Sequence, residues 1–264
     1  MTHKIIFFDI DGTLLSETTH KIPESAKLAV KNAQENGHLL FINTGRGISN
    51  IVPSIKEMNF DGYVCGCGTY IEFKGKELFS KSFSNSFARE MIDDMHEFKI
   101  DSILEGKSGI YFDNDDLIYE KEVAETKERN IKDTSCKVKS FYDESLDFDK
   151  LVIWTNPNSS FDKFYDKYKD TFDFIHRENN FYELVPLGYS KATGIEFLIN
   201  ELDIDFNDTY ALGDSTNDLT MLEYVKNSVA MGNSNPKLFD LVSYVTSDIE
   251  EDGVYNALKH YDII

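Results

Sequence analysis

The first 70 residues of the chain alternate short apolar runs with segments of helical periodicity. Continuous apolar runs at Lys4–Phe8, His38–Ile42 and Tyr63–Cys65 are typical of strands that are buried on both faces of a sheet. Between the first two runs, apolar positions on one side from Ala26 to Ala33 predict a helix, which Asn36-Gly37 would terminate. This order predicts a parallel sheet with right-handed crossovers.

The alternation is interrupted between about residues 82 and 184. A helix is expected over Ile48–Met58, and Lys74-Gly75-Lys76 predicts a hairpin turn. Residues 82–184 then mix helical and strand-like segments. Helices are expected at Ser86–Phe98, Asp116–Arg129 and Phe161–Tyr168, and strands at Ile110–Phe112, Lys150–Trp154 and Phe181–Val185. Strand and helix alternate again after Pro186. We therefore predict an α/β core over residues 1–81 and 185–264, with an inserted α+β domain at 82–184.

Composition narrows the classes of partner. The chain carries 27 Lys and Arg against 47 Asp and Glu, a formal charge of −20, which disfavours nucleic acid and anionic membranes. No apolar run reaches the roughly 18 residues of a membrane span, and acids interrupt the N-terminal run too early for a signal peptide. The sparse cysteines (Cys65, Cys67, Cys136) imply no disulfide framework, so a cytoplasmic protein is expected.

The strongest chemical signal directly follows the first predicted strand. Asp9 and Asp11 are two residues apart and face the same side, while Gly12 permits a sharp turn. Two carboxylates that close favour either a shared proton or a divalent cation. A solvated turn would explain Asp11-Gly12 but would not explain Asp9.

A second acidic group follows the predicted strand Thr209–Leu212, in Gly213-Asp214-Ser215-Thr216-Asn217-Asp218. One acid could serve only to cap the next helix. If both strands end at the same edge of the sheet, however, Asp9, Asp11, Asp214 and Asp218 meet there. Such a set of hard oxygen ligands suits Mg²⁺.

Two weaker signals could contribute groups that bind an anion. Thr44-Gly45 follows the second predicted strand and offers a hydroxyl and main-chain amides before a helical segment. Lys191 stands in the first turn of a predicted helix, where its charge opposes the helix dipole. A common turn and a solvated lysine are the alternatives for these two signals.

Taken in order, these motifs resemble those of the haloacid dehalogenase superfamily of phosphatases: Asp-x-Asp-Gly-Thr-Leu at 9–14, Thr-Gly-Arg at 44–46, Ser-Lys at 190–191 and Gly-Asp-Ser-x-Asn-Asp at 213–218. The long insertion is similar to the C2 cap of the Cof-type (type IIB) subfamily. The resemblance implies a Rossmann-like core and a cap that selects the substrate. Cys67 stands where many relatives carry Asn, so contacts to the leaving group are expected to differ.

The resemblance also implies a role for each matching residue. Asp9 would be the nucleophile that forms an aspartyl-phosphate, and Asp11 the general acid and base. Asp9, Asp214 and the main-chain carbonyl of Asp11 would bind Mg²⁺, supported by Asp218. The substrate phosphate would be held by the remaining residues: Thr44, Gly45, Lys191 and Asn217.

The function expected from these features is Mg²⁺-dependent hydrolysis of phosphate monoesters of small metabolites: sugar phosphates, nucleotides or phosphorylated cofactors. One alternative is a phospho-accepting receiver domain, which also clusters Asp, Thr and Lys but needs only about 120 residues. Another is a non-catalytic relative that binds a phosphorylated ligand, although loss of Asp9 or Asp11 would then be expected.

Overall fold

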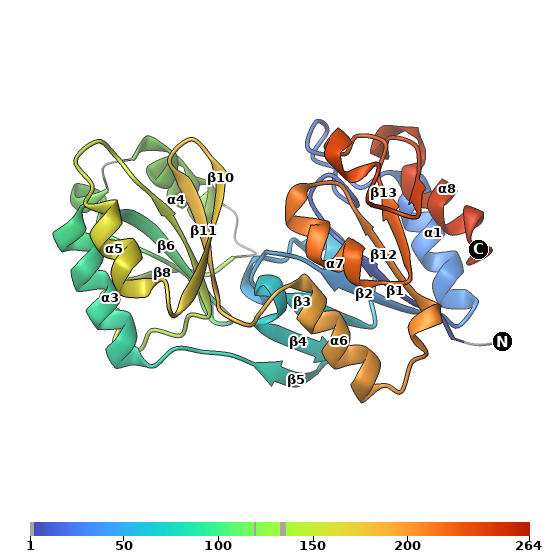
Figure 1. The fold of residues 1–264 in the computed structure, drawn as a ribbon, viewed down its shortest axis with the longest axis horizontal. Coiled ribbons are helices and arrows are strands. Elements are labelled where there is room, and N and C mark those ends of the chain that lie inside the picture. The colour runs from blue at the N-terminus through green and yellow to red at the C-terminus, as the bar shows by residue number, and fades with distance from the viewer. Residues whose placement is uncertain (1–2, 119, 133–135) are drawn as a thin grey trace. The chain divides into compact units, whose positions relative to one another are not determined.

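The computed structural model describes residues 3–118, 120–132 and 136–264. The chain forms two compact units (Figure 1). Unit 1 comprises Met1–Gly45, Pro53–Phe79 and Ser190–Ile264, and unit 2 comprises Arg46–Val52 and Ser80–Tyr189. The predicted domain limits (1–81 with 185–264, and 82–184) stay a prediction; unit 2 overlaps the predicted insertion and also takes in the short segment that follows Gly45.

Unit 1 is built on a sheet in the strand order β14-β13-β12-β1-β2-β3-β4-β5. The strands are β1 (Ile5–Phe8), β2 (Leu39–Asn43), β3 (Gly62–Cys65), β4 (Tyr70–Phe73), β5 (Lys76–Ser80), β12 (Thr209–Gly213), β13 (Asn227–Ala230) and β14 (Tyr244–Val245). The six strands from β14 to β3 are parallel, and β4 pairs antiparallel with β3. The predicted parallel α/β core is therefore confirmed.

Helices cover this sheet. They are α1 (Glu24–Glu35), α2 (Pro53–Lys56), α6 (Lys191–Glu201), α7 (Leu219–Tyr224) and α8 (Gly253–His260). Alternate strand residues Ile5, Phe7 and Phe41 pack in one apolar core with residues of α6 and α7. Helices α1 and α8 lie side by side, away from α6 and α7 (Figure 1). This packing buries every side chain of β1, as its continuous apolar run predicts.

Unit 2 has its own sheet, in the order β10-β11-β9-β6-β7-β8. Its elements are α3 (Asn85–Phe98), β6 (Asp101–Gly106), β7 (Gly109–Phe112), α4 (Lys121–Lys132), β8 (Val138–Ser140), β9 (Lys150–Trp154), α5 (Phe161–Tyr168), β10 (Phe172–Glu178) and β11 (Phe181–Pro186). The described strand pairs are antiparallel except β7–β8. Separate apolar clusters pack on this sheet, so unit 2 is an α+β unit with its own core.

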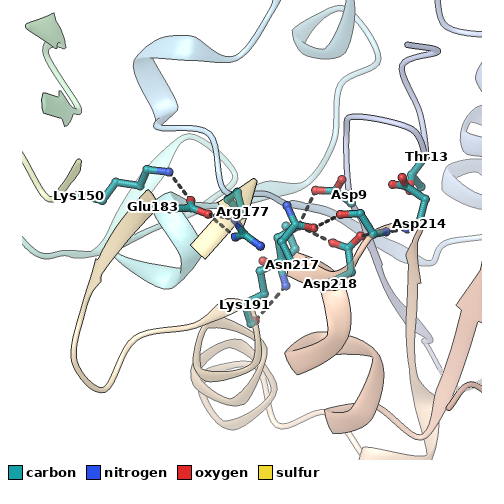
Figure 2. A network of polar contacts seen from close by, with 11 residues as sticks. Asp9, Thr13, Lys150, Arg177, Glu183, Lys191, Asp214, Asn217 and Asp218 are labelled. Atoms are coloured by element: carbon teal, nitrogen blue, oxygen red, sulfur yellow. Dashed lines mark hydrogen bonds and ion pairs between the residues drawn. The ribbon is translucent and has the colours of Figure 1, made fainter. Parts of the chain in front are cut away.

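Charged side chains are also buried inside unit 2 and compensate one another (Figure 2). Lys150 Nζ lies 2.5 Å from Glu183 Oε1 and 3.8 Å from Glu105 Oε2, and Arg177 Nε donates to Glu183 Oε2 at 3.0 Å. Burial alone would raise the pKa of Glu183, but Lys150 and Arg177 outweigh it and hold that pKa at about 2. Burial of Glu105 raises the pKa of its own carboxyl group. These pairs keep Glu183 ionised within the sheet.

Several predicted elements differ from the observed ones. The prediction of a helix over Ile48–Met58 is wrong. A 3-10 turn at Ile48–Asn50 is followed by extended backbone at Ile51 and then by the short α2. Pro53 causes this break, because a proline restricts the residue before it to extended backbone. The helix expected over Asp116–Arg129 begins later, as α4 at Lys121; residue 119 lies outside the described residues. Strands β6, β8, β10 and β14 and helix α8 were not predicted.

Two features concern the chain as a whole. In the part of the chain that the structure describes, no helix is long and apolar enough to cross a membrane. The side chains of Cys65, Cys67 and Cys136 are all buried.

Candidate active site

The predicted chemical motifs of unit 1 meet at one edge of its sheet. Strands β2, β1 and β12 are adjacent and parallel, so their carboxyl ends lie side by side. Asp9 directly follows β1, and its main-chain N–H donates to Leu212 O at 3.0 Å. Asp214 directly follows β12, and Thr44 directly follows β2. Segments about 200 residues apart in the sequence thus converge as the parallel topology requires.

The loop after Asp9 is folded tightly against Asp214. The N–H groups of Leu14 and Leu15 donate to Ile10 O at 2.9 and 2.8 Å, and Gly12 adopts a positive φ of 79°. A Cβ atom at Gly12 would lie 2.3 Å from Asp214 Oδ2, so glycine is required by both backbone and space. Thr13 Oγ1 donates to Asp214 Oδ1 at 3.1 Å (Figure 2). The loop therefore fixes one face of the Asp214 carboxylate.

Asp218 organises the second acidic motif. Its Oδ2 accepts hydrogen bonds from the main-chain N–H groups of Asp214 at 2.9 Å and Ser215 at 3.0 Å. These bonds form part of the capping box that begins the helical turn Thr216–Asp218. Gly213 makes room for them, since a Cβ there would lie 2.6 Å from Asp218 Cβ. Asp218 thus caps the turn, as the simpler interpretation holds, but its other oxygen has a different partner.

That partner is Lys191, the first residue of α6. Its Nζ lies 2.6 Å from Asp9 Oδ1 and 2.5 Å from Asp218 Oδ1 (Figure 2). The side chain is 1% exposed, so the alternative of a solvated lysine is wrong. Ser190 begins the helix with a capping box in which Thr193 N–H donates to Ser190 Oγ. The first residue of α6 therefore places a buried ammonium group between the carboxylates of Asp9 and Asp218.

Three buried carboxylates share this small volume. One oxygen each from Asp9, Asp214 and Asp218 lie within 4.8 Å of one another, and the residues are 3%, 9% and 0% exposed. Burial first, and then the charge of Asp218, raise the pKa of Asp9 from 3.8 to about 7. Burial, followed by the charges of Asp218 and Asp9, raises the pKa of Asp214 to about 8. One ammonium does not fully compensate three carboxylates at this spacing.

The pKa of Lys191 moves in the direction that its neighbours dictate. Burial alone would lower it, but the carboxylates of Asp218 and Asp9 outweigh burial and raise the pKa above its ordinary value. Lys191 is therefore a permanent cation at the site. Its charge opposes the rise in the pKa of Asp9 without cancelling it.

The other predicted site residues occupy the same edge of unit 1. Asp11 is half-buried and bridges to Leu15, but its carboxylate is not in the group of three that lie within 4.8 Å. Thr44 is buried, and its N–H donates to Val64 O at 2.9 Å; Gly45 follows it and is half-buried. Asn217 is half-buried, and its Oδ1 accepts a hydrogen bond from Ser215 Oγ at 2.5 Å.

Two side chains that hold the site together were not predicted as site residues. Thr13 binds Asp214 as described, and Asn233 Nδ2 donates to Gly12 O at 2.8 Å while its Oδ1 accepts from Ile249 N–H at 2.9 Å. The Asn233 contact joins positions 221 residues apart, so no local pattern could reveal it.

The chain is similar to known proteins along nearly its whole length. A family model described as haloacid dehalogenase-like hydrolase matches residues 6–258. The chain is 29% identical over 269 residues to "Putative phosphatase YkrA" of Bacillus subtilis (strain 168), covering all of both chains. Among solved structures, a protein from Geobacillus kaustophilus HTA426 has a TM-score of 0.86 at 27% identity, covering 99% of this chain and 100% of that one. The subclass IIB sugar phosphatase BT4131 has a TM-score of 0.80 at 26% identity, with coverage of 99% and 100%.

Proposed function

The chain belongs to the haloacid dehalogenase-like hydrolase family, and we propose that it is a Mg²⁺-dependent phosphatase acting on phosphate monoesters of small metabolites. One observation carries the proposal above all: a buried Lys191 ammonium lies 2.6 Å from an Asp9 carboxylate that shares its pocket with two further acids. Phosphoryl transfer to a carboxylate needs a nucleophile and concentrated positive charge at one place. The similarity to relatives named as phosphatases supports the same reaction.

The residues present fit a divalent cation. Asp9 and Asp214 supply hard carboxylate oxygens, and burial first, then the neighbouring carboxylates, raise the pKa of both. We assign these two side chains and the main-chain carbonyl of Asp11 as ligands. Asp218 stays behind them, because its oxygens already hold Lys191 and two main-chain N–H groups. When bound, Mg²⁺ would favour the ionised carboxylates and withdraw charge from the phosphoryl oxygens.

The reaction proceeds in two displacements on this chain's residues. In the first, an Asp9 carboxylate oxygen bonds to phosphorus while the bond from phosphorus to the leaving oxygen breaks, and Asp11 gives its proton to that oxygen. In the second, Asp11 takes a proton from water as the water oxygen attacks phosphorus and the bond to Asp9 breaks. Phosphate leaves, and both carboxyl groups return to their starting states.

The remaining predicted site residues would bind the oxygens of the substrate phosphate. Lys191 supplies the fixed positive charge, and Thr44 and Gly45 supply a hydroxyl and main-chain N–H groups beyond β2. We assign the amide nitrogen of Asn217 to the same task, since its Oδ1 is held by Ser215. Together these groups would stabilise the charge that spreads over the transferring phosphoryl group.

Sugar phosphates are the first substrate class to test, because BT4131 is named a sugar phosphatase; nucleotides and phosphorylated cofactors follow. We place the protein in the cytoplasm, because a chain with only three cysteines suits a reducing compartment. The strong negative charge makes nucleic acid an unsuitable partner.

The decisive experiment is a panel of phosphorylated metabolites and p-nitrophenyl phosphate, assayed for phosphate release with Mg²⁺ and after treatment with EDTA. We expect many turnovers per molecule, abolished by EDTA and restored by Mg²⁺. A single stoichiometric phosphorylation without turnover would favour the receiver-domain alternative. Saturable binding of phosphoesters without hydrolysis would favour a non-catalytic relative.

A further inference from the structure

Asn43, the last residue of β2, carries a buried side-chain amide that none of the steps above uses. It lies two positions after Phe41, so its side chain points to the same face of the sheet, the face on which α6 packs. Its Nδ2 donates to the main-chain carbonyl of Lys191 at 3.0 Å. This bond ties the strand that ends at Thr44 to the first residue of α6.

The other end of the Asn43 amide is unsatisfied. Asn43 is 0% exposed, and its Oδ1 has no hydrogen-bond partner among the described residues. Turning the amide over would not help, because Oδ1 would then face the Lys191 carbonyl oxygen. A buried acceptor without a donor costs at least as much as one neutral hydrogen bond contributes. For stability alone, an apolar residue of similar size would serve at least as well at this position.

The backbone at the start of α6, which carries Lys191, is tightly packed by its neighbours. The turn at Gly68 lies so close to the start of α6 that a Cβ there would lie 2.5 Å from Ser190 O. The carbonyl that Asn43 binds belongs to the residue whose ammonium must sit between Asp9 and Asp218. A shift of this backbone by a fraction of an ångström changes the distance from Nζ to the reacting carboxylate.

We propose that Asn43 is a positioning residue, which fixes the Lys191 ammonium relative to Asp9 at the expense of the protein's stability. This inference rests on the proposed function, because it concerns the phosphoryl transfer assigned above. It explains why a polar side chain with an unpartnered oxygen occupies a fully buried strand position. Such exceptions to hydrogen-bond satisfaction are expected where function constrains the structure.

The test compares two substitutions with opposite expected signatures. Asn43→Leu should leave the Tm unchanged within about 3 °C, or raise it. It should lower kcat for p-nitrophenyl phosphate about 10- to 100-fold, with a smaller change in KM, since misplacement of a charged group chiefly affects the transition state. Thr209→Val is the control: it removes a buried hydroxyl that donates to Phe206 O at 2.7 Å, at the opposite end of β12, and should lower the Tm without changing kcat.

Two further measurements make the outcome decisive. In a Lys191→Arg background, Asn43→Leu should cause a smaller loss than in the wild type, because the two residues act on the same contact. Asn43→Ala should show the same loss of kcat if leucine at this position fails to fold. An unchanged kcat in an active enzyme, or parallel losses of kcat and Tm in both Asn43 variants, would overturn this inference and leave the proposed function standing. A wild type inactive on every phosphomonoester would instead remove the proposed function, and the inference with it.

Discussion

Replacing Asp214 by Asn should stabilise the metal-free protein at alkaline pH while destroying its activity. Asp214 shares its pocket with Asp9 and Asp218, whose oxygens lie within 4.8 Å. The pKa of Asp214 is raised from 3.8 to about 8. A raised carboxyl pKa contributes stability that is fully present below pH 3.8 and is lost as the pH rises through about 8. Asparagine cannot ionise, so the variant escapes this loss and still offers an oxygen to the Thr13 hydroxyl.

The size of the effect follows from the geometry. Two carboxylates 4.8 Å apart repel by about 3.5 kcal/mol at an effective dielectric constant of 20. Asp214 faces two such charges, and Lys191 offsets part of the repulsion. We expect Asp214→Asn to gain about 3 kcal/mol over the wild type at pH 8.5 and little at pH 4.5, which corresponds to about 6–12 °C in Tm.

Thermal unfolding in EDTA at pH 4.5, 6.5 and 8.5 measures this difference. Asp240→Asn is the matched control, because it removes one charge from an exposed position and should shift the Tm little at any pH. Adding Mg²⁺ at pH 8.5 should raise the Tm of the wild type more than that of Asp214→Asn. A gain that is absent at pH 8.5, or equal at pH 4.5, would refute the reasoning about uncompensated charge.

Three further substitutions test other parts of the site. Asp9→Asn should abolish turnover of p-nitrophenyl phosphate while the far-ultraviolet circular dichroism stays unchanged, because the amide is not a nucleophile; more than about 3% residual activity would contradict the assignment. Asp218→Asn should cost about 1–3 kcal/mol in urea unfolding, because an amide whose oxygen keeps the two main-chain N–H groups turns its NH₂ group toward the Lys191 ammonium, which Asp9 still compensates; no loss would argue against that pairing. Gly12→Ala should impair both Mg²⁺ binding, measured by calorimetry, and activity, because its Cβ would lie 2.3 Å from Asp214 Oδ2; unchanged binding would show that the loop can yield.

The sequence alone determined the α/β core and the location of its chemistry. Continuous apolar runs identify strands buried on both faces, and parallel strands bring their carboxyl ends to one edge whatever lies between them in sequence. Acids that directly follow two such strands, Asp9 and Asp214, were therefore predicted to meet, and the structure brings them together. The helix expected over Ile48–Met58 does not form as one element, because Pro53 favours extended backbone before it and separates the turn at Ile48–Asn50 from α2.

Only the tertiary structure decided how these groups interact. Whether Lys191 is solvated or buried depends on the packing of α6, and no property of its neighbours in sequence fixes this. The same holds for Asn43 and Asn233, whose partners lie 148 and 221 residues away. Apolar periodicity determines which face of an element is buried, because burial acts on many residues at once. Hydrogen bonds and ion pairs require single distances to be correct within a few tenths of an ångström, and these distances exist only once the elements have packed.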